Sequence, residues 1–192
     1  MRMRAKNIYK SHEEPNQPEP HHEEDWDDVF DFLYDLLNVI EEIVDWWQDW
    51  DGFNNFDYTQ GTSLDDVIGA SDASQVIVTF SGNDLIETGD GTDFVFAGVG
   101  NDTIVAGNGT NYLRGGLDSD TFVFQAGTTG TTFIRDMVSG QDIIDLSDLA
   151  LQSPDDVVVR TNGAGTFLLI DQLTIHINLT PDQLLDSDFI FV

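Results

Sequence analysis

Acidic residues recur at a fixed interval in the middle of the chain. From Gly61 to Val123 the sequence divides without a gap into seven units of nine residues. The sixth position is Asp in five units, and Gln75 and Asn111 stand at the other two. The four central units carry glycine at the fourth position, which permits a tight turn with positive φ and lets carbonyl oxygens point at a common centre. Because hard cations prefer oxygen ligands, this combination of carboxylates and glycine turns indicates a binder of hard cations.

The same units carry one apolar residue in a constant phase. The eighth position is apolar in all seven units: Ile68, Ile77, Ile86, Val95, Ile104, Leu113 and Phe122. In a chain of this hydrophobic content, such a run has a chance of about two in a thousand. A repeat of this length indicates stacked units that bury a continuous core together.

The units resemble the nonapeptide G-G-x-G-x-D-x-U-x of RTX, or hemolysin-type, calcium-binding proteins. The resemblance is most specific in the third to fifth units, whereas the first two lack the fourth-position glycine. It implies a mainly β fold, a parallel β-roll (a calcium-binding β-solenoid) of seven nonads over residues 59–124. In that fold six residues turn, three form a strand, and two units make one coil. Ions lie between turns on the same edge, so the resemblance implies ligands eighteen residues apart.

This spacing divides the candidate ligands into two unequal edges. The first edge is wholly acidic: Asp66, Asp84, Asp102 and Asp120. The second edge has Gln75, Asp93 and Asn111, with partial compensation at the third position from Asp72, Asp90 and Asn108. The further candidate ligands are Gly82, Gly91, Gly100, Gly109 and Asp118. We expect two or three strong ions on the first edge and one or two weaker ions on the second, about three to five Ca²⁺ in all. The alternative is a solenoid whose Asp and Asn only satisfy turns, but unneutralised stacked carboxylates would repel.

The overall composition agrees with a binder of hard cations. The formal net charge is −29, with 36 acids against 7 bases. Such a charge opposes compaction unless cations neutralise it, and it repels nucleic acid and anionic lipid head groups. The 13 Phe and 4 Trp are too many for a chain that is disordered throughout. The absence of Cys excludes disulfides, zinc-thiolate sites and Cys nucleophiles.

Two segments precede the repeats. Residues 1–24 predict a disordered acidic tail, and residues 25–51 predict an amphipathic acidic helix. One apolar stripe of that helix is Trp26, Phe30, Leu33, Leu37, Ile40, Val44 and Trp47. The helix is expected to pack on its own domain, to join molecules, or, least favoured, to enter a membrane. An aromatic patch is expected on the outward side of repeats two, four and six, and the helix would cover it within a chain or between chains: Val76, Val78, Phe94, Phe96, Tyr112 and Arg114.

Residues 125–192 predict a C-terminal β-rich cap, because strand-like pieces alternate with Gly, Asn and Pro turns. This part resembles the C-terminal part of serralysin-type RTX proteins around residues 134–147. The resemblance gives Asp136, Asp142 and Asp145 as ligands of one more ion, with turn and capping roles as the alternative. The final residues resemble an uncleaved type I secretion signal, and a buried last strand is a compatible interpretation: Asp188, Phe189, Ile190, Phe191 and Val192. The basic N-terminus has no apolar stretch behind it, so no Sec signal peptide is predicted.

No enzyme is predicted. The sequence has no His-Glu-x-x-His, no Ser/His/Asp grouping and no Gly-rich phosphate loop, and His176 is expected to be a packed or exposed strand residue. The favoured function is that of a calcium-folded extracellular protein, secreted by a bacterial type I system, that serves as a structural, adhesive or interaction module. Its partners would be copies of itself or a cell-surface or matrix component, without nucleic acid. The alternative is a small membrane-active, toxin- or bacteriocin-like effector that uses the Trp-rich helix.

Overall fold

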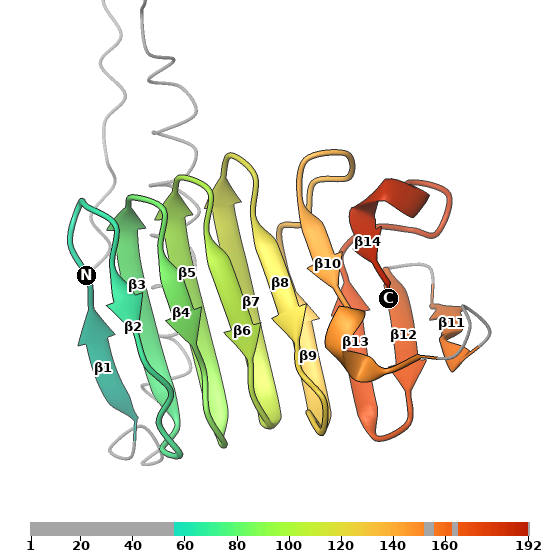
Figure 1. The fold of residues 1–192 in the computed structure, drawn as a ribbon, viewed down its shortest axis with the longest axis horizontal. Helices are drawn as coiled ribbons and strands as arrows, with labels where there is room; N and C mark the ends of the chain where they lie inside the picture. Colours follow the sequence, from blue (N-terminus) through green and yellow to red (C-terminus); the bar gives the residue numbers. More distant parts are fainter. Residues whose placement is uncertain (1–55, 152–155, 163–164, 192) are drawn as a thin grey trace, which may run out of the picture.

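A computed structural model describes residues 56–151, 156–162 and 165–191. The tail predicted at 1–24 and the helix predicted at 25–51 lie outside the described residues. Within them the chain winds as a coil between two facing sheets, and each coil adds one parallel strand to each sheet (Figure 1). This architecture confirms the predicted parallel β-roll.

The first sheet has eight strands and the second has six. In spatial order the first sheet consists of β1 (Asp57–Gln60), β3 (Gln75–Ser81), β5 (Thr92–Val99), β7 (Gly109–Leu117), β9 (Gly130–Ile134), β13 (Leu173–Ile177), β12 (Thr166–Ile170) and β11 (Val158–Thr161). The second consists of β14 (Phe189–Ile190), β10 (Ile143–Asp145), β8 (Thr121–Phe124), β6 (Thr103–Ala106), β4 (Leu85–Glu87) and β2 (Val67–Ile68).

The register between neighbouring coils is eighteen residues through the repeats. Val95 pairs with Ile77 on one side and with Leu113 on the other. The strands of the first sheet are longer than the three residues expected, because pairing continues into the turns, as in Ser81 opposite Val99. The coil also extends beyond the seven nonads, with β1 before them and β9, β10 and β14 after them.

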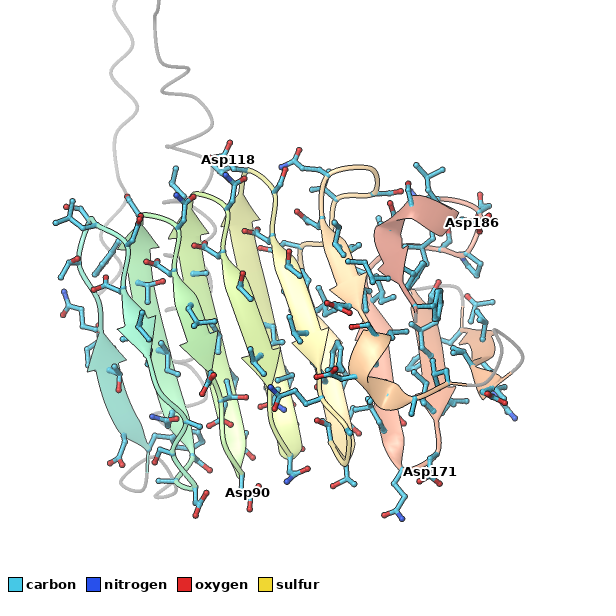
Figure 2. All side chains as sticks on the ribbon, in the orientation of Figure 1. Asp90, Asp118, Asp171 and Asp186 are labelled. Atoms are coloured by element: carbon cyan, nitrogen blue, oxygen red, sulfur yellow. The ribbon has the colours of Figure 1, made fainter. Side chains whose placement is uncertain are left out.

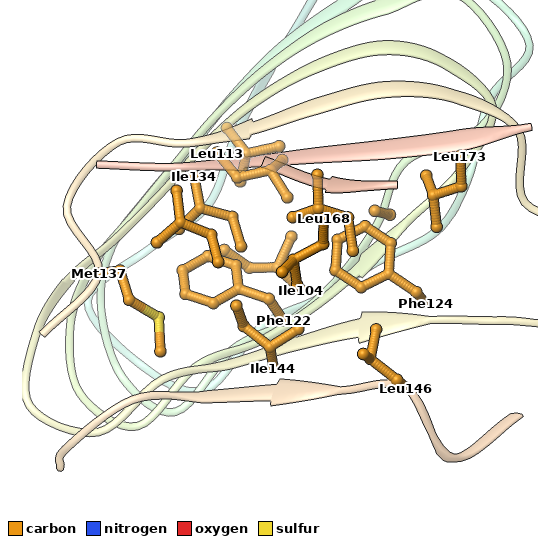
Figure 3. Packing of buried hydrophobic residues seen from close by; sticks show 14 of the residues in the cluster. Ile104, Leu113, Phe122, Phe124, Ile134, Met137, Ile144, Leu146, Leu168 and Leu173 are labelled. Carbon is orange, nitrogen blue, oxygen red and sulfur yellow. The ribbon is translucent and has the colours of Figure 1, made fainter. Parts of the chain in front are cut away.

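The core lies between the two sheets. The eighth-position residues from Ile77 to Phe122 are all 0% exposed, since alternate strand residues point inward. Ile68, in the end coil, is only half-buried. After the repeats the core continues through Ile134, Met137, Ile144 and Leu146 (Figure 3). Each large side chain buried in this way contributes about 1.5–3 kcal/mol to stability.

The C-terminal part closes one end of the roll. Strands β11, β12 and β13 form an antiparallel meander, and β13 pairs in parallel with β9. Strand β14 pairs in parallel with β10 and is the last strand of the second sheet. Two short 3-10 helices occur here, η2 (Ser147–Leu149) and η4 (Asp186–Asp188). Among the described residues no helix has the length and apolar character needed to cross a membrane.

Candidate metal centre

The two edges of the roll consist of its turns. Turns that lead from the first sheet to the second form the first edge, where Asp118 is labelled in Figure 2. Turns that lead back form the second edge, where Asp90 and Asp171 are labelled. The sixth-position residues of the first edge directly precede the strands of the second sheet, and those of the second edge lie at or near the start of the strands of the first sheet. The repeat therefore stacks them above one another from coil to coil.

On the first edge, five aspartates form a hydrogen-bonded column across the coils. In each contact, Oδ1 of one aspartate accepts the main-chain N–H of the aspartate one coil earlier. The contacts are Asp84 with Asp66 at 2.8 Å, Asp102 with Asp84 at 2.8 Å, Asp120 with Asp102 at 3.0 Å and Asp142 with Asp120 at 3.0 Å. The eighteen-residue spacing therefore brings together all four predicted acids of this edge, and Asp142 extends the column by one coil.

The second oxygen distinguishes the middle of this column from its ends. Oδ2 of Asp84, Asp102 and Asp120 is buried and has no hydrogen-bond partner. At one end, Oδ2 of Asp66 accepts the Thr62 N–H at 2.6 Å. At the other end, Oδ2 of Asp142 accepts the Val138 N–H at 2.8 Å. The column thus presents three buried carboxylate oxygens whose hydrogen-bonding capacity is unused.

Within the described residues, no positively charged group is among the causes that shift the pKa values of Asp102 and Asp120. Burial raises the pKa of Asp102 to about 7 and that of Asp120 to about 8. Each carboxylate accepts a hydrogen bond from the main-chain N–H of the aspartate one coil earlier, which lowers its pKa. The negative charges of neighbouring carboxylates raise the pKa further. At the strand spacing of about 4.8 Å and an effective dielectric constant of about 20, two such charges repel by on the order of 3 kcal/mol. A cation between the coils would remove this repulsion.

The second edge offers one comparable place. Oδ1 of Asp93 accepts the Gln75 N–H at 2.9 Å, while Asp93 Oδ2 and Gln75 Oε1 are buried without a partner. Burial raises the pKa of Asp93 to about 7. The amide of Asn111 is already engaged, with Nδ2 donating to Gly107 O at 3.0 Å and Oδ1 accepting from Thr88 Oγ1 at 3.2 Å. Asn111 therefore does not continue the open column.

The third-position residues of the second edge bond to each other. Asn108 Nδ2 donates to Asp90 Oδ1 at 2.8 Å across one coil, and Asn108 Oδ1 accepts the Thr129 N–H at 2.9 Å. Asp72 is exposed. This pattern links coils and leaves less oxygen available for a metal than the sixth position does.

The fourth-position glycines bring the main chains of successive turns close together. Gly82, Gly91, Gly100 and Gly109 all have positive φ. A Cβ on Gly100 would lie 2.0 Å from Gly82 O, and one on Gly109 would lie 2.1 Å from Gly91 O. Asp118 occupies the same position in the last repeat and adopts φ 76°. Since no three Asp, Glu or His side chains converge within the described residues, a cation here would also need such main-chain oxygens.

Asp136 and Asp145, two of the acids that the resemblance gave as ligands of one more ion, accept hydrogen bonds in the closing coil. Both oxygens of Asp136 accept main-chain N–H groups, from Gly115 at 3.2 Å and Gly116 at 3.1 Å. Oδ1 of Asp145 accepts the Ser147 N–H at 2.9 Å at the start of η2. These contacts correspond to the turn and capping roles that the sequence left open for Asp136 and Asp145.

Sequence reasoning missed one further column on the first edge. At the fifth position, the side chains of Asp65, Asn83 and Asn101 accept the N–H of the residue one coil later, at 2.7, 2.8 and 3.0 Å. It also missed Asp57, which precedes the second-edge column in β1. Extending the nine-residue phase one unit back from Gly61 places Asp57 at a sixth position, so the signal was present in the sequence.

Two overlapping stretches, residues 70–104 and 87–122, match the family of the RTX calcium-binding nonapeptide repeat (4 copies). Residues 70–122 are RTX repeats. These residues therefore form a calcium-binding repeat region, and its unpartnered carboxylate oxygens are the hard ligands that Ca²⁺ prefers.

Two solved structures are similar to this chain. One is the solution structure of the AlgE6R3 subunit from the Azotobacter vinelandii mannuronan C5-epimerase, 25% identical over 65% of this chain and 80% of that one, with a TM-score of 0.32. The other is the AlgE6R2 subunit of the same enzyme, 20% identical over 70% of this chain and 92% of that one, with a TM-score of 0.40. No curated protein matches the chain.

The C-terminal residues of the chain belong to the closing coil. Asp188 is 1% exposed and accepts the Ser139 hydroxyl at 2.6 Å and the Gly140 N–H at 2.8 Å. Phe189 and Ile190 form β14, and Phe191 is 41% exposed. Val192 lies outside the described residues. Phe189 is half-buried and Ile190 is 40% exposed, so β14 is paired but its side chains are not fully buried, and the secretion signal remains a prediction.

Proposed function

We propose that this chain is a secreted protein whose roll folds when Ca²⁺ enters the two edges, and that it serves as an extracellular structural, adhesive or interaction module. The observation that carries the proposal is the row of three buried, unpartnered Oδ2 atoms of Asp84, Asp102 and Asp120. Main-chain N–H groups already hold Oδ1 of these residues in place. In the folded roll the free oxygens are therefore held in a fixed orientation.

The ions would be shared between neighbouring coils. On the first edge Asp84, Asp102 and Asp120 would each contribute a carboxylate oxygen to a site, and main-chain carbonyl oxygens of the closely stacked glycine turns would be further ligands. On the second edge Asp93 would hold one ion, with Gln75 Oε1 as a neutral ligand. This distribution gives three strong sites and one weaker site, within the expected range of three to five ions.

Calcium dependence would also suit export. Without Ca²⁺ the carboxylate columns repel, so the chain stays open where calcium is scarce and folds where calcium is abundant. The free energy of ion binding is then part of the free energy of folding. The role proposed for the folded module is to present its surfaces to partners, and no catalytic step is part of the proposal.

Circular dichroism of the full chain, in chelator and during a Ca²⁺ titration, tests this function. We expect a cooperative gain of β signal on titration, and native mass spectrometry at the plateau should count three to five ions. Identical spectra in chelator and in saturating Ca²⁺ would show that calcium does not drive folding. Mg²⁺ at equal concentration is the control, since its strict octahedral geometry fits these shared sites poorly.

A further inference from the structure

The outer face of the first sheet carries a continuous row of rings. Phe94 stacks on Tyr112 with centroids 4.8 Å apart, and Tyr112 stacks on Phe133 at 4.9 Å. The row continues through His176, whose ring lies 5.4 Å from Phe133 and 4.2 Å from Phe167. These five residues, called the aromatic row below, are cross-strand partners in register and share one face of the sheet.

The same face gathers the positive charge of the roll. After Lys10 the chain has only three Lys or Arg residues, Arg114, Arg135 and Arg160. The guanidinium of Arg135 lies 5.4 Å from the Tyr112 ring centroid and 5.1 Å from that of Phe133. Arg160 is the register partner of Phe167, and Arg114 lies two residues beyond Tyr112 on β7 and also faces Asp136. In a chain of net charge −29, this face is a local site for anions.

The outer face of the second sheet differs. Its outward positions in the repeats carry aliphatic residues, Thr, Gly or Glu, and none of them is aromatic or positively charged. They are Val67, Gly69, Leu85, Glu87, Thr103, Val105, Thr121 and Val123. Only the first sheet therefore offers rings beside guanidinium groups among the described residues.

We infer that the acidic segment 25–51 of the same chain covers the aromatic row. That segment has ten Asp and Glu residues and no Lys or Arg, beside an apolar stripe rich in Trp and Leu. Its apolar stripe could bury the rings of the aromatic row, and its negative charges are opposite to those of the three arginines. No other stretch of the chain combines both features.

The place where the segment joins the roll favours docking within the chain. Only residues 52–55 separate the segment from Phe56, and four residues span at most about 14 Å. The Phe56 ring lies 5.9 Å from that of Phe94, so the chain enters β1 beside the aromatic row. A tether this short gives the segment a high effective concentration at the face, which a second copy would have to outcompete.

Tryptophan fluorescence of the full chain tests this docking, because all four Trp lie in the segment, at positions 26, 46, 47 and 50. In saturating Ca²⁺ we expect a blue-shifted emission and reduced acrylamide quenching, both independent of protein concentration. Tyr112→Glu should abolish the shift. Thr103→Glu is the matched control, since it adds the same charge at a half-buried outward position of the second sheet.

Arg135→Glu provides a second variant, because the Arg135 side chain is exposed and its loss leaves the core intact. It should restore acrylamide quenching while the β signal stays that of the wild type. Wild-type quenching in both Tyr112→Glu and Arg135→Glu would overturn the proposal. So would a shift that appears only at concentrations where light scattering shows a dimer, or only with anionic vesicles added. Circular dichroism of each variant separates loss of docking from failure of the calcium-dependent fold.

Discussion

Oδ1 of Asp102 accepts the main-chain N–H of Asp84 at 2.8 Å, across eighteen residues of sequence, while Oδ2 of the same carboxylate is buried without a partner. One side chain therefore links two coils and leaves an oxygen ready for a cation. Asp120 repeats the arrangement one coil later, and Asp93 repeats it on the second edge.

Removing the charge of Asp102 should weaken calcium binding far more than a change on the second edge. Asp102→Asn retains an oxygen acceptor of the same size but loses the charge, so adjacent sites lose a charged ligand. If the charged ligand contributes more than about 1.4 kcal/mol to binding, its loss raises the calcium midpoint about tenfold or more. Asn111→Ala should shift the midpoint much less, because the Asn111 amide is already hydrogen bonded within the turn. Equal shifts in calcium titrations of the two variants would contradict the unequal edges.

The calcium-free roll should become less stable as the pH rises from about 4, near the ordinary pKa of Asp, to about 8. Burial raises the pKa of Asp93 and Asp102 to about 7 and of Asp120 to about 8, above the ordinary value of 3.8. The folded state therefore binds these protons more tightly than the unfolded chain, and the stabilisation is lost once the pH exceeds the folded-state pKa. Circular dichroism in chelator at about pH 5 and about pH 8.5 should therefore show more residual β signal at the lower pH.

Calcium should reverse this dependence, because it competes with the same protons. The calcium midpoint should fall as the pH rises over the same range, with protons released on binding. Asp120→Asn should flatten both trends, since Asp120 has the highest of the three pKa values. A calcium midpoint that does not change with pH would show that these carboxylates are not the ligands.

The close approach of the turns predicts a strict requirement for glycine. Gly100 has φ +131°, and a Cβ there would lie 2.0 Å from Gly82 O. Gly100→Ala should therefore cost about 1–3 kcal/mol in backbone strain alone, measured as the free energy of unfolding in saturating Ca²⁺. Gly69→Ala is the control, because a Cβ on Gly69 meets nothing within 4 Å. If both variants unfold alike, the stacked carbonyl arrangement is not what limits the turn.

The repeats could be predicted because their physics is local and periodic. The eighth position of each nine-residue unit is apolar and the sixth is acidic in most units. Together with the eighteen-residue coil that the resemblance implies, this spacing predicts the column from Asp66 to Asp120. Which oxygens remain open does not follow, since this depends on Thr62 and Val138 at the two ends of the column.

The closing coil breaks the period. Leu113 pairs with Ile134 and Phe122 with Ile144, so the register there is 21 and 22 residues and no longer eighteen. The nine-residue phase cannot place Asp142 beneath Asp120 after such insertions. The pairing of β13 with β9 joins residues still farther apart in the sequence, with Ile177 opposite Ile134. No repeat or turn motif in the sequence predicts this pairing.

The closing coil should depend on Asp188 for its stability. Its carboxylate accepts the Ser139 hydroxyl, the Gly140 N–H and the Leu185 N–H, at 2.6, 2.8 and 2.8 Å. Although burial acts to raise it, these hydrogen bonds hold the pKa of Asp188 below its usual value. The bonds join the turn before β10 to the turn before β14, so they fasten the last strand of the second sheet.

Asp188→Ala leaves these donors without an acceptor, which typically costs about 1–3 kcal/mol for a buried group. Hydrogen exchange in saturating Ca²⁺ should then show lost protection in β14 and β10, with β4 and β6 unchanged. Asp186→Ala is the control, since Asp186 is exposed in the same 3-10 helix. Wild-type protection of β14 in Asp188→Ala would mean that the Phe189 and Ile190 pairing with β10 holds the strand without the carboxylate.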